Sequence, residues 1–182
     1  MKILVTPRSF KNSVNDEARE KLERFAEVKA VRPEKPFTED ELIALLDGCD
    51  GYVAGLDNVT AKVIENCPQL KVISRWGVGY DKVDTAAASK AGITVTYTPG
   101  VMAVSVAELA LGLMLDCARR ITVQDGQVRG GAWAPINGTE LFGKTVGIIG
   151  YGAIGKQLGR LTNGIGMTTY AYDPFMNEAY AK

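Results

Sequence analysis

The sequence predicts an α/β fold in which a parallel sheet is covered by helices. Short apolar runs alternate along the first part of the chain with amphipathic stretches of helical period, which is the pattern of strands joined by crossover helices. Further along, an apolar strand, a glycine-rich turn and a helical stretch follow one another directly. These observations favour a sheet domain followed by a second unit that begins with a strand of its own.

The elements of the first part follow from local patterns. Strands are expected at residues 3–5, 28–31, 51–54, 72–74 and 93–96. Helices are expected at residues 15–26, 38–48, 60–66 and 84–92. In the first helix Ala18, Leu22, Phe25 and Ala26 share one face, which we expect to be buried.

The ends of two of these helices carry recognisable caps. Thr38-Glu39-Asp40-Glu41 has the form of a capping box, and Gly48 is placed to end the helix that it opens. Asp84 is an N-cap residue for the last helix of this part.

The pattern then changes. Residues 105–120 predict a long helix, opened by a second capping box at Ser105-Val106-Ala107-Glu108 and apolar on nearly every side. Such a helix is typically buried between domains or subunits. Residues 124–141, which contain Trp133, show no clear period and predict a long ordered arm or loop. We place the domain boundary near Val101 to Ser105, giving domains 1–103 and 104–182.

The strongest chemical signal is a glycine turn. Residues 144–149 predict a buried strand that runs into Gly150-Tyr151-Gly152-Ala153-Ile154-Gly155, and residues 156–163 predict the helix that follows. A strand, a G-x-G-x-x-G turn and a helix in this order form the fingerprint of a dinucleotide site.

Each glycine of the turn has a physical role in such a site. Gly150 permits the tight turn, Gly152 lets the backbone approach a pyrophosphate, and Gly155 lets the helix pack closely on the strand. Ala153 and Ile154 lie at the start of the helix, whose free N–H groups and partial positive charge attract phosphates.

An acid completes the pattern. Residues 168–172 predict a second strand, and Asp173 follows it at the spacing of the acid that accepts hydrogen bonds from the adenosine ribose. Because a carboxylate there repels a ribose phosphate, NAD is favoured over NADP. The alternative is a purely steric glycine turn with a surface acid, but the strand, the helix and Asp173 together favour the cofactor.

Composition excludes several other classes of protein. Acidic and basic residues are balanced at 21 each without a basic block, so we expect no nucleic-acid partner. The apolar runs are too short for a signal peptide or a membrane span. Cys49, Cys67 and Cys117 are too few and scattered for a disulfide framework or a metal site, which favours the cytoplasm. The chain has no histidine, and therefore lacks the usual general base.

Several motifs, in order, resemble the D-isomer-specific 2-hydroxyacid dehydrogenase family, closest to members like D-3-phosphoglycerate dehydrogenase. The motifs are Arg75-Trp76-Gly77-Val78-Gly79-Tyr80-Asp81, Thr98-Pro99-Gly100 leading to Ser105-Val106-Ala107-Glu108, Gly130-Gly131-Ala132-Trp133, and Glu140-Leu141-Phe142-Gly143 leading into the glycine turn. The resemblance covers essentially the whole chain.

The resemblance implies a flavodoxin-like parallel-sheet substrate domain followed by the first part of a Rossmann dinucleotide-binding domain. It implies that Arg75, Gly77, Val78 and Gly79 meet the substrate, a small 2-hydroxy or 2-oxo acid. It places Thr98 against NAD together with the glycine turn and Asp173. It also implies a homodimer formed through the long helix and the Trp133 arm.

The chain also departs from the family pattern. Met102 stands where relatives usually have Asn, and Ala153 stands where many have Arg. The catalytic Arg, Glu and His of the family are expected downstream of Lys182, so the 182 residues appear as a truncated chain and are expected to be inactive alone.

Three hypotheses remain open. The first is an NAD-dependent oxidoreductase acting on a D-2-hydroxy acid, with a substrate like 3-phosphoglycerate favoured. The second is a non-catalytic protein on the same fold that senses a dinucleotide or binds a partner. The third is a freestanding flavodoxin-like module, because a fold alone does not determine a function.

Overall fold

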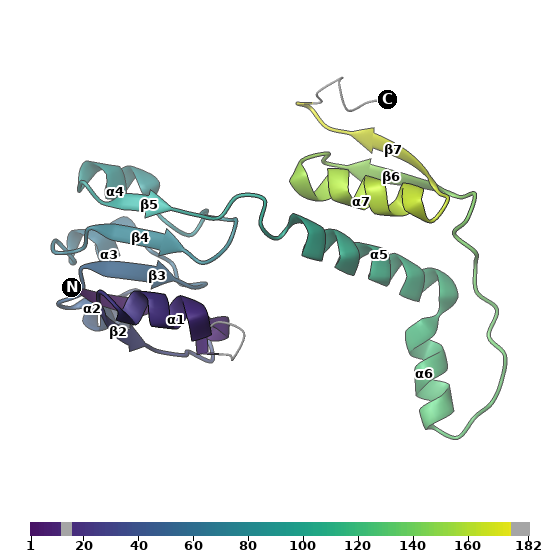
Figure 1. Cartoon of the computed structure of the whole chain (residues 1–182), viewed down its shortest axis with the longest axis horizontal. Helices are drawn as coiled ribbons and strands as arrows, with labels where there is room; N and C mark the ends of the chain where they lie inside the picture. Colours follow the sequence, from purple (N-terminus) through teal and green to yellow (C-terminus); the bar gives the residue numbers. More distant parts are fainter. Residues whose placement is uncertain (12–15, 176–182) are drawn as a thin grey trace. The chain divides into compact units, whose positions relative to one another are not determined.

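The computed structural model describes residues 1–11 and 16–175. The chain divides into two compact units, Met1–Pro99 and Gly100–Lys182 (Figure 1). The division falls shortly before the boundary expected between residues 103 and 104.

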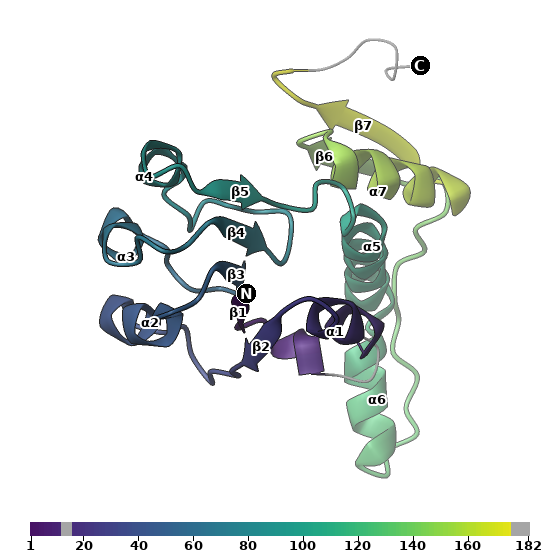
Figure 2. The ribbon, with the colours of Figure 1, turned by 60° about the vertical axis from the view of Figure 1, so that its left-hand side comes forward.

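The first unit is built on a parallel sheet of five strands. They are β1 (Lys2–Val5), β2 (Glu27–Ala30), β3 (Gly51–Ala54), β4 (Val72–Arg75) and β5 (Thr94–Thr96). Their order in the sheet is β2-β1-β3-β4-β5, and every neighbouring pair is parallel (Figure 2). This is the strand order of the flavodoxin-like fold, so the predicted fold class is confirmed.

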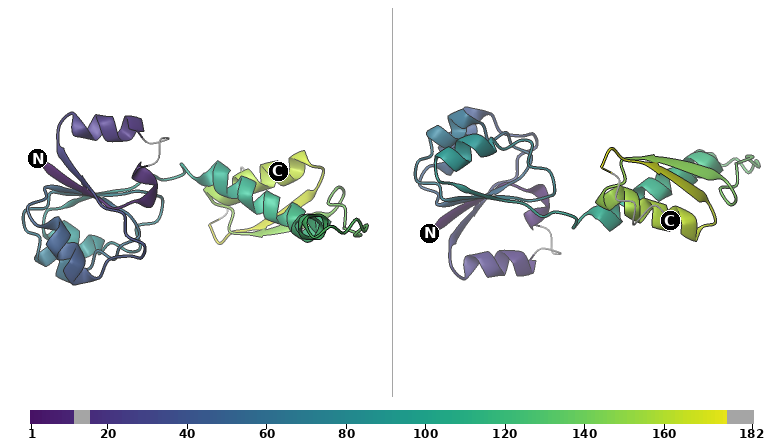
Figure 3. Two further views of the ribbon diagram at one scale, coloured as in Figure 1. Left: turned by 90° about the horizontal axis from the view of Figure 1, so that it is seen from below. Right: turned by 90° about the horizontal axis from the view of Figure 1, so that it is seen from above.

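Helices cover both faces of this sheet. They are the 3-10 helix η1 (Arg8–Lys11) and the α-helices α1 (Asp16–Glu23), α2 (Glu39–Leu46), α3 (Ala61–Glu65) and α4 (Thr85–Lys90). Figure 3 shows α1 on one face and the other three α-helices on the opposite face. Because strand side chains alternate, Leu4 and Tyr52 join the larger core under α2 to α4, while Ile3 and Val53 join the smaller core with Phe10.

The predicted caps are present. The Thr38 hydroxyl accepts from the Glu41 N–H at 3.3 Å, and the Glu41 carboxylate accepts from the Thr38 N–H at 2.8 Å. Gly48 has a φ of +69°, the left-handed conformation expected beyond a helix end. The Asp84 carboxylate accepts from the Ala87 N–H at 2.9 Å.

The prediction for the first helix was wrong at its C-terminal end. The helix ends at Glu23 rather than at residue 26, and Phe25 is 59% exposed instead of buried. The chain turns after Glu23 to enter β2, and this turn leaves Leu22 and Ala26 on the core while Phe25 points to solvent. Asn15, where the helix was expected to begin, lies outside the described residues.

The second unit contains α5 (Ala103–Arg119), α6 (Ile121–Arg129), β6 (Thr145–Ile149), α7 (Ala153–Gly164) and β7 (Thr168–Tyr172). The two strands pair in parallel, with Thr145 opposite Thr168 and Ile149 opposite Tyr172. Helix α7 packs on these strands and on α5. This is the opening β-α-β of a Rossmann domain, as predicted.

The capping box predicted at Ser105 is wrong. Helix α5 begins at Ala103 with Met102 as its N-cap residue, and Ser105 lies inside the helix. The helix starts earlier because the chain turns at Gly100, whose carbonyl accepts from the Ala103 N–H at 3.0 Å. The rest of the described chain covers only part of α5, because Ala107 is buried whereas Leu109 is 63% exposed.

The predicted irregular arm begins later than expected, because residues 121–129 form α6. Arg120 takes a left-handed φ of 56° and ends α5. The Asp116 carboxylate then accepts from both the N–H and the hydroxyl of Thr122, each at 2.6 Å, and caps the new helix. The sequence did not predict α6, because the contacts between Asp116 and Thr122 join two successive helices and produce no helical periodicity.

The strand before the glycine turn was expected to be buried, and this expectation was also wrong. Ile148 is buried, but Ile149 is 91% exposed. Helix α7 covers one face of the β6-β7 pair, and within the described residues the opposite face has no cover. Alternation along the strand therefore leaves Ile149 open.

Candidate functional site

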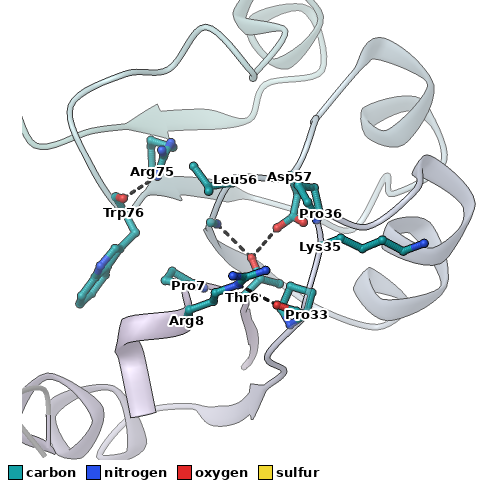
Figure 4. A pocket seen from close by; sticks show the side chains of 11 residues that line it. Thr6, Pro7, Arg8, Pro33, Lys35, Pro36, Leu56, Asp57, Arg75 and Trp76 are labelled. Atoms are coloured by element: carbon teal, nitrogen blue, oxygen red, sulfur yellow. Dashed lines mark hydrogen bonds between the residues drawn. The ribbon is translucent and has the colours of Figure 1, made fainter. Parts of the chain in front are cut away.

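The first candidate site is a pocket at the carboxyl edge of the five-stranded sheet. In this strand order the direction of winding reverses between β1 and β3, and ligands of such sheets bind outside the carboxyl ends at that point. A pocket of about 240 Å³ lies there, formed by the segments that follow β1, β2, β3 and β4 (Figure 4). Its walls are mainly apolar, from Pro7, Pro33, Pro36, Leu56 and Trp76.

A buried acid is part of the lining of this pocket. Asp57 is 2% exposed, and its carboxylate accepts from the Thr6 hydroxyl at 2.6 Å, the Tyr52 hydroxyl at 2.7 Å and the Phe37 N–H at 3.0 Å. Burial raises the pKa of Tyr52 far above its usual value, so this phenol stays a donor. The network ties the end of β1 to the end of β3.

Sequence reasoning missed this pocket and its network. Thr6 directly follows β1 and Asp57 follows β3, so a polar residue after each of two neighbouring strands was the available signal. That signal needs the strand order, because only neighbouring carboxyl ends bring such residues together.

The predicted substrate turn lies beside this pocket. Arg75 ends β4, and its Nη1 donates to the carbonyl oxygens of Trp76 at 2.5 Å and Ala54 at 3.3 Å. Gly77 has a φ of +145°, and a Cβ built on it would lie 3.3 Å from Arg75 Nη1. A side chain at Gly77 would therefore be strained and would press on the guanidinium.

The turn presents unused donors. Across the described part of the chain, the backbone N–H groups of Val78 and Gly79 have no hydrogen-bond acceptor. Successive N–H groups of this kind form concavities that bind anions. Thr98, predicted to contact the cofactor, donates its N–H to the Gly77 carbonyl at 3.1 Å, so it lies against the same turn.

The second candidate site is the glycine turn of the other unit. Gly150 has a φ of +92°, which only glycine adopts readily, and its N–H donates to the Tyr172 carbonyl at 2.8 Å. A Cβ at Gly155 would collide with the Gly150 carbonyl oxygen, whereas a Cβ at Gly152 would have no neighbour within 4 Å. Gly150 thus permits the turn, Gly155 permits close packing of the helix, and Gly152 leaves the approach to the turn open.

The helix that follows supplies donors to this open side. The first intrahelical bond of α7 runs from the Lys156 N–H to the Gly152 carbonyl at 3.0 Å. The N–H groups of Ala153 and Ile154 therefore have no acceptor within the described residues. Open space over Gly152 beside free N–H groups fits a pyrophosphate.

Asp173 lies next to this turn. One carboxylate oxygen accepts from the Tyr151 N–H at 2.7 Å and the other accepts from the Phe175 N–H at 2.8 Å. Each oxygen can accept a further bond, so the carboxylate keeps capacity for ribose hydroxyls. The structure also shows a glycine that sequence reasoning missed: a Cβ at Gly159 would lie 2.8 Å from the Tyr151 hydroxyl.

The helices described for this chain include none with the length and apolar character needed to cross a bilayer. Among the described residues, no group of three or more Cys, Asp or Glu side chains is arranged to hold a metal ion.

Residues 5–182 match the family model of the D-isomer specific 2-hydroxyacid dehydrogenase catalytic domain. The chain belongs to this family. The resemblance stated from the sequence motifs is therefore confirmed at the level of the family.

Individual relatives carry different names. The chain is 35% identical to a glyoxylate reductase of Korarchaeum cryptofilum, covering 97% of this chain and 55% of the relative. It is 37% identical to a D-3-phosphoglycerate dehydrogenase of Methanocaldococcus jannaschii, covering 100% of this chain and 34% of the relative. Members of the family with a similar sequence thus have different substrates in their names.

A solved structure gives the same fold. The NAD⁺-bound 3-phosphoglycerate dehydrogenase of Entamoeba histolytica matches with a TM-score of 0.77 at 33% identity, covering 97% of this chain and 55% of that one. The chain thus spans roughly half or less of the length of these relatives. The roles of single residues at the two sites stay predictions.

Proposed function

We propose that this chain supplies the substrate domain (1–103) and the first part of the NAD-binding domain (104–182) of an NAD-dependent D-2-hydroxyacid dehydrogenase. The observation that carries the proposal is the glycine turn, with free N–H groups at Ala153 and Ile154, open space over Gly152, and Asp173 beside it. A bound NAD supplies the hydride acceptor for the hydroxyl-bearing carbon.

The cofactor-binding residues of the proposal are Thr98, Gly150, Gly152, Ala153, Ile154, Gly155 and Asp173. The N–H groups at the start of α7 hold the pyrophosphate, and Asp173 accepts from the ribose hydroxyls. The carboxylate also disfavours a ribose phosphate, which supports NAD over NADP.

The substrate-binding residues of the proposal are Arg75, Gly77, Val78 and Gly79. The free N–H groups of Val78 and Gly79 bind the carboxylate of a 2-hydroxy or 2-oxo acid, and Arg75 adds positive charge beside them. The substrate that we favour resembles 3-phosphoglycerate, because the quoted motifs are closest to that branch and the M. jannaschii relative carries that name.

The 182 residues contain no histidine, so a histidine base cannot come from them. We therefore expect the chain alone not to oxidise a 2-hydroxy acid, because loss of a general base costs roughly a hundredfold to ten-thousandfold in rate. A dinucleotide-sensing protein without catalysis is the second candidate, because the glycine turn and Asp173 could bind a dinucleotide without any catalytic group.

We further propose a homodimer in the cytoplasm. Leu109 and Leu113 of α5 are 63% and 56% exposed, and Trp133 of the arm is 91% exposed. The described part of the chain leaves these large apolar side chains uncovered, as is typical of an interaction surface. A second copy would bury these side chains. Analytical ultracentrifugation across a concentration series tests the dimer.

Calorimetric titration with NAD, NADP and ADP-ribose tests the cofactor assignment. We expect NAD and ADP-ribose to bind about equally, because the residues assigned here contact the adenosine and pyrophosphate groups. Gly152→Val should abolish binding of both by filling the open side of the turn. Absence of binding by the wild type at millimolar concentration would contradict the proposal.

A further inference from the structure

Two arginines line the pocket at the carboxyl edge of the first sheet, and the proposed function uses only one of them. Arg8 begins η1, and its Nε donates to the Pro33 carbonyl at 2.9 Å. Figure 4 shows its side chain lying beside Thr6 and reaching toward Pro33. Its terminal Nη groups have no acceptor within the described residues.

Positive side chains outnumber acids in the lining of this pocket, because Arg8, Lys35 and Arg75 line it with Asp57 as the acid. Among the described residues neither Arg8 nor Arg75 forms an ion pair with an acid. Asp57 also lines the pocket, but it is 2% exposed, and its carboxylate already accepts hydrogen bonds from Thr6, Tyr52 and Phe37. Lys35 also lines the pocket, although Figure 4 shows its side chain extending outward.

The walls strengthen the attraction of these arginines for an anion. Pro7, Pro33, Pro36 and Leu56 bring apolar atoms around the cavity, and a charge attracts its partner more strongly where water is excluded. A volume of about 240 Å³ is below that of typical drug-sized pockets, which begin at roughly 300 Å³. A cavity of this size has room for one acidic group on a short carbon chain.

The segment that carries Arg8 is fastened to the substrate turn. The Trp76 indole N–H donates to the Ser9 hydroxyl at 3.1 Å, and the Trp76 ring meets Phe10 edge-on at 5.9 Å between centroids. Trp76 lines the pocket and also begins the turn that bears the free N–H groups of Val78 and Gly79. The pocket and the turn are therefore adjoining parts of one packed surface.

We propose that Arg8 determines substrate specificity by binding a second acidic group at the far end of the 2-hydroxy acid. The turn takes the carboxylate next to the reacting carbon, and the Arg8 guanidinium takes a carboxylate or phosphate carried farther along the chain. The preferred substrates are then acids that carry two anionic groups. This inference rests on the proposed function, because that function assigns the first carboxylate to the turn.

The test uses nuclear magnetic resonance titration of the isotopically labelled 182-residue protein. Three ligands are compared: D-glycerate, D-3-phosphoglycerate and D-2-hydroxyglutarate. The proteins are the wild type, Arg8→Gln, Arg8→Lys, and Arg24→Gln as the matched control. Arg24 is an exposed arginine outside the pocket, so its substitution removes the same charge elsewhere.

We expect all three ligands to shift the amides of Val78 and Gly79. The two ligands with a second anionic group should also shift the Arg8 Nε–H and the amide of Gly55, which lines the pocket, and should bind about tenfold more tightly than glycerate. Arg8→Gln should abolish this preference, while Arg8→Lys keeps part of it and Arg24→Gln keeps all of it. Preference for phosphoglycerate alone identifies a phosphate site, and preference for both ligands identifies a general acid site.

Equal affinity for glycerate and for both ligands with a second anionic group overturns the role of Arg8 and leaves the proposed function standing. An equal loss of preference in Arg8→Gln and Arg24→Gln also overturns it, since the effect would then be one of net charge. If no ligand shifts Val78 or Gly79, the substrate turn of the proposed function fails, and the inference fails with it.

Discussion

The Asp173 carboxylate accepts a hydrogen bond of 2.7 Å from the backbone N–H of Tyr151. The acid that follows β7 therefore holds the glycine turn that follows β6, 22 residues earlier in the chain. The same carboxylate is the group assigned to the cofactor ribose. One side chain thus has a structural role and a proposed binding role, and its variants must be chosen to separate them.

Asp173→Ala should weaken NAD binding about tenfold or more, because a charge-assisted hydrogen bond is lost. It should also narrow the preference for NAD over NADP, since the negative charge beside the ribose is gone. Asp173→Asn is the matched control, because its amide oxygen can still accept from the Tyr151 N–H. We expect Asp173→Asn to keep the turn intact but to lose the preference for NAD over NADP. Calorimetry measures both, and unchanged NAD affinity in Asp173→Ala contradicts the ribose assignment.

Gly155→Ala should lower the free energy of unfolding of the second unit by about 1–3 kcal/mol, because the new methyl group meets the Gly150 carbonyl oxygen. Gly152→Ala should change it by less than about 1 kcal/mol, since the methyl group there enters open space. Urea titrations followed by the amide resonances of α7 measure both. Equal destabilisation by the two variants would show that Gly155 does not permit the close packing.

Tyr52→Phe should destabilise the first unit by about 1 kcal/mol, the usual contribution of one hydrogen bond. Asp57→Ala should cost about 2–4 kcal/mol, because it leaves the buried Thr6 and Tyr52 hydroxyls and the Phe37 N–H without their acceptor. Urea unfolding followed by Trp76 fluorescence in a Trp133→Phe background compares them. A smaller loss for Asp57→Ala than for Tyr52→Phe contradicts the network.

Helix α6 should lose its cap in acid. The hydroxyl and the N–H of Thr122 donate to Asp116 and lower the pKa of its carboxyl group below the usual value. A lowered pKa in the folded state means that the carboxylate stabilises the fold above the ordinary aspartate pKa. This stabilisation is lost as the pH falls through the lowered value.

The Thr122 amide resonance measures this effect across an acid titration. We expect it to shift and its hydrogen exchange to accelerate as Asp116 takes up a proton. Asp116→Asn is the control and should remove this pH dependence. An identical titration of Thr122 in that variant would assign the effect to another acid.

The sequence by itself determined the local features of this protein. The alternation of apolar runs and amphipathic stretches, the caps at Thr38 and Asp84, and the G-x-G-x-x-G turn each depend on residues within a few positions of one another. Such features are physical properties of short segments, so they can be read without the fold. Asp173 could be predicted for the same reason, because it directly follows a strand.

Only the tertiary structure determined which residues from distant parts of the sequence lie next to one another. The pocket joins Arg8, Pro33, Asp57 and Arg75, which follow or end four different strands and meet only because the order of the sheet is β2-β1-β3-β4-β5. Exposure was likewise misjudged at Phe25, where a short turn redirects a side chain that periodicity places on the core. Contacts between distant segments depend on strand order and chain reversals, and no periodicity in the sequence encodes them.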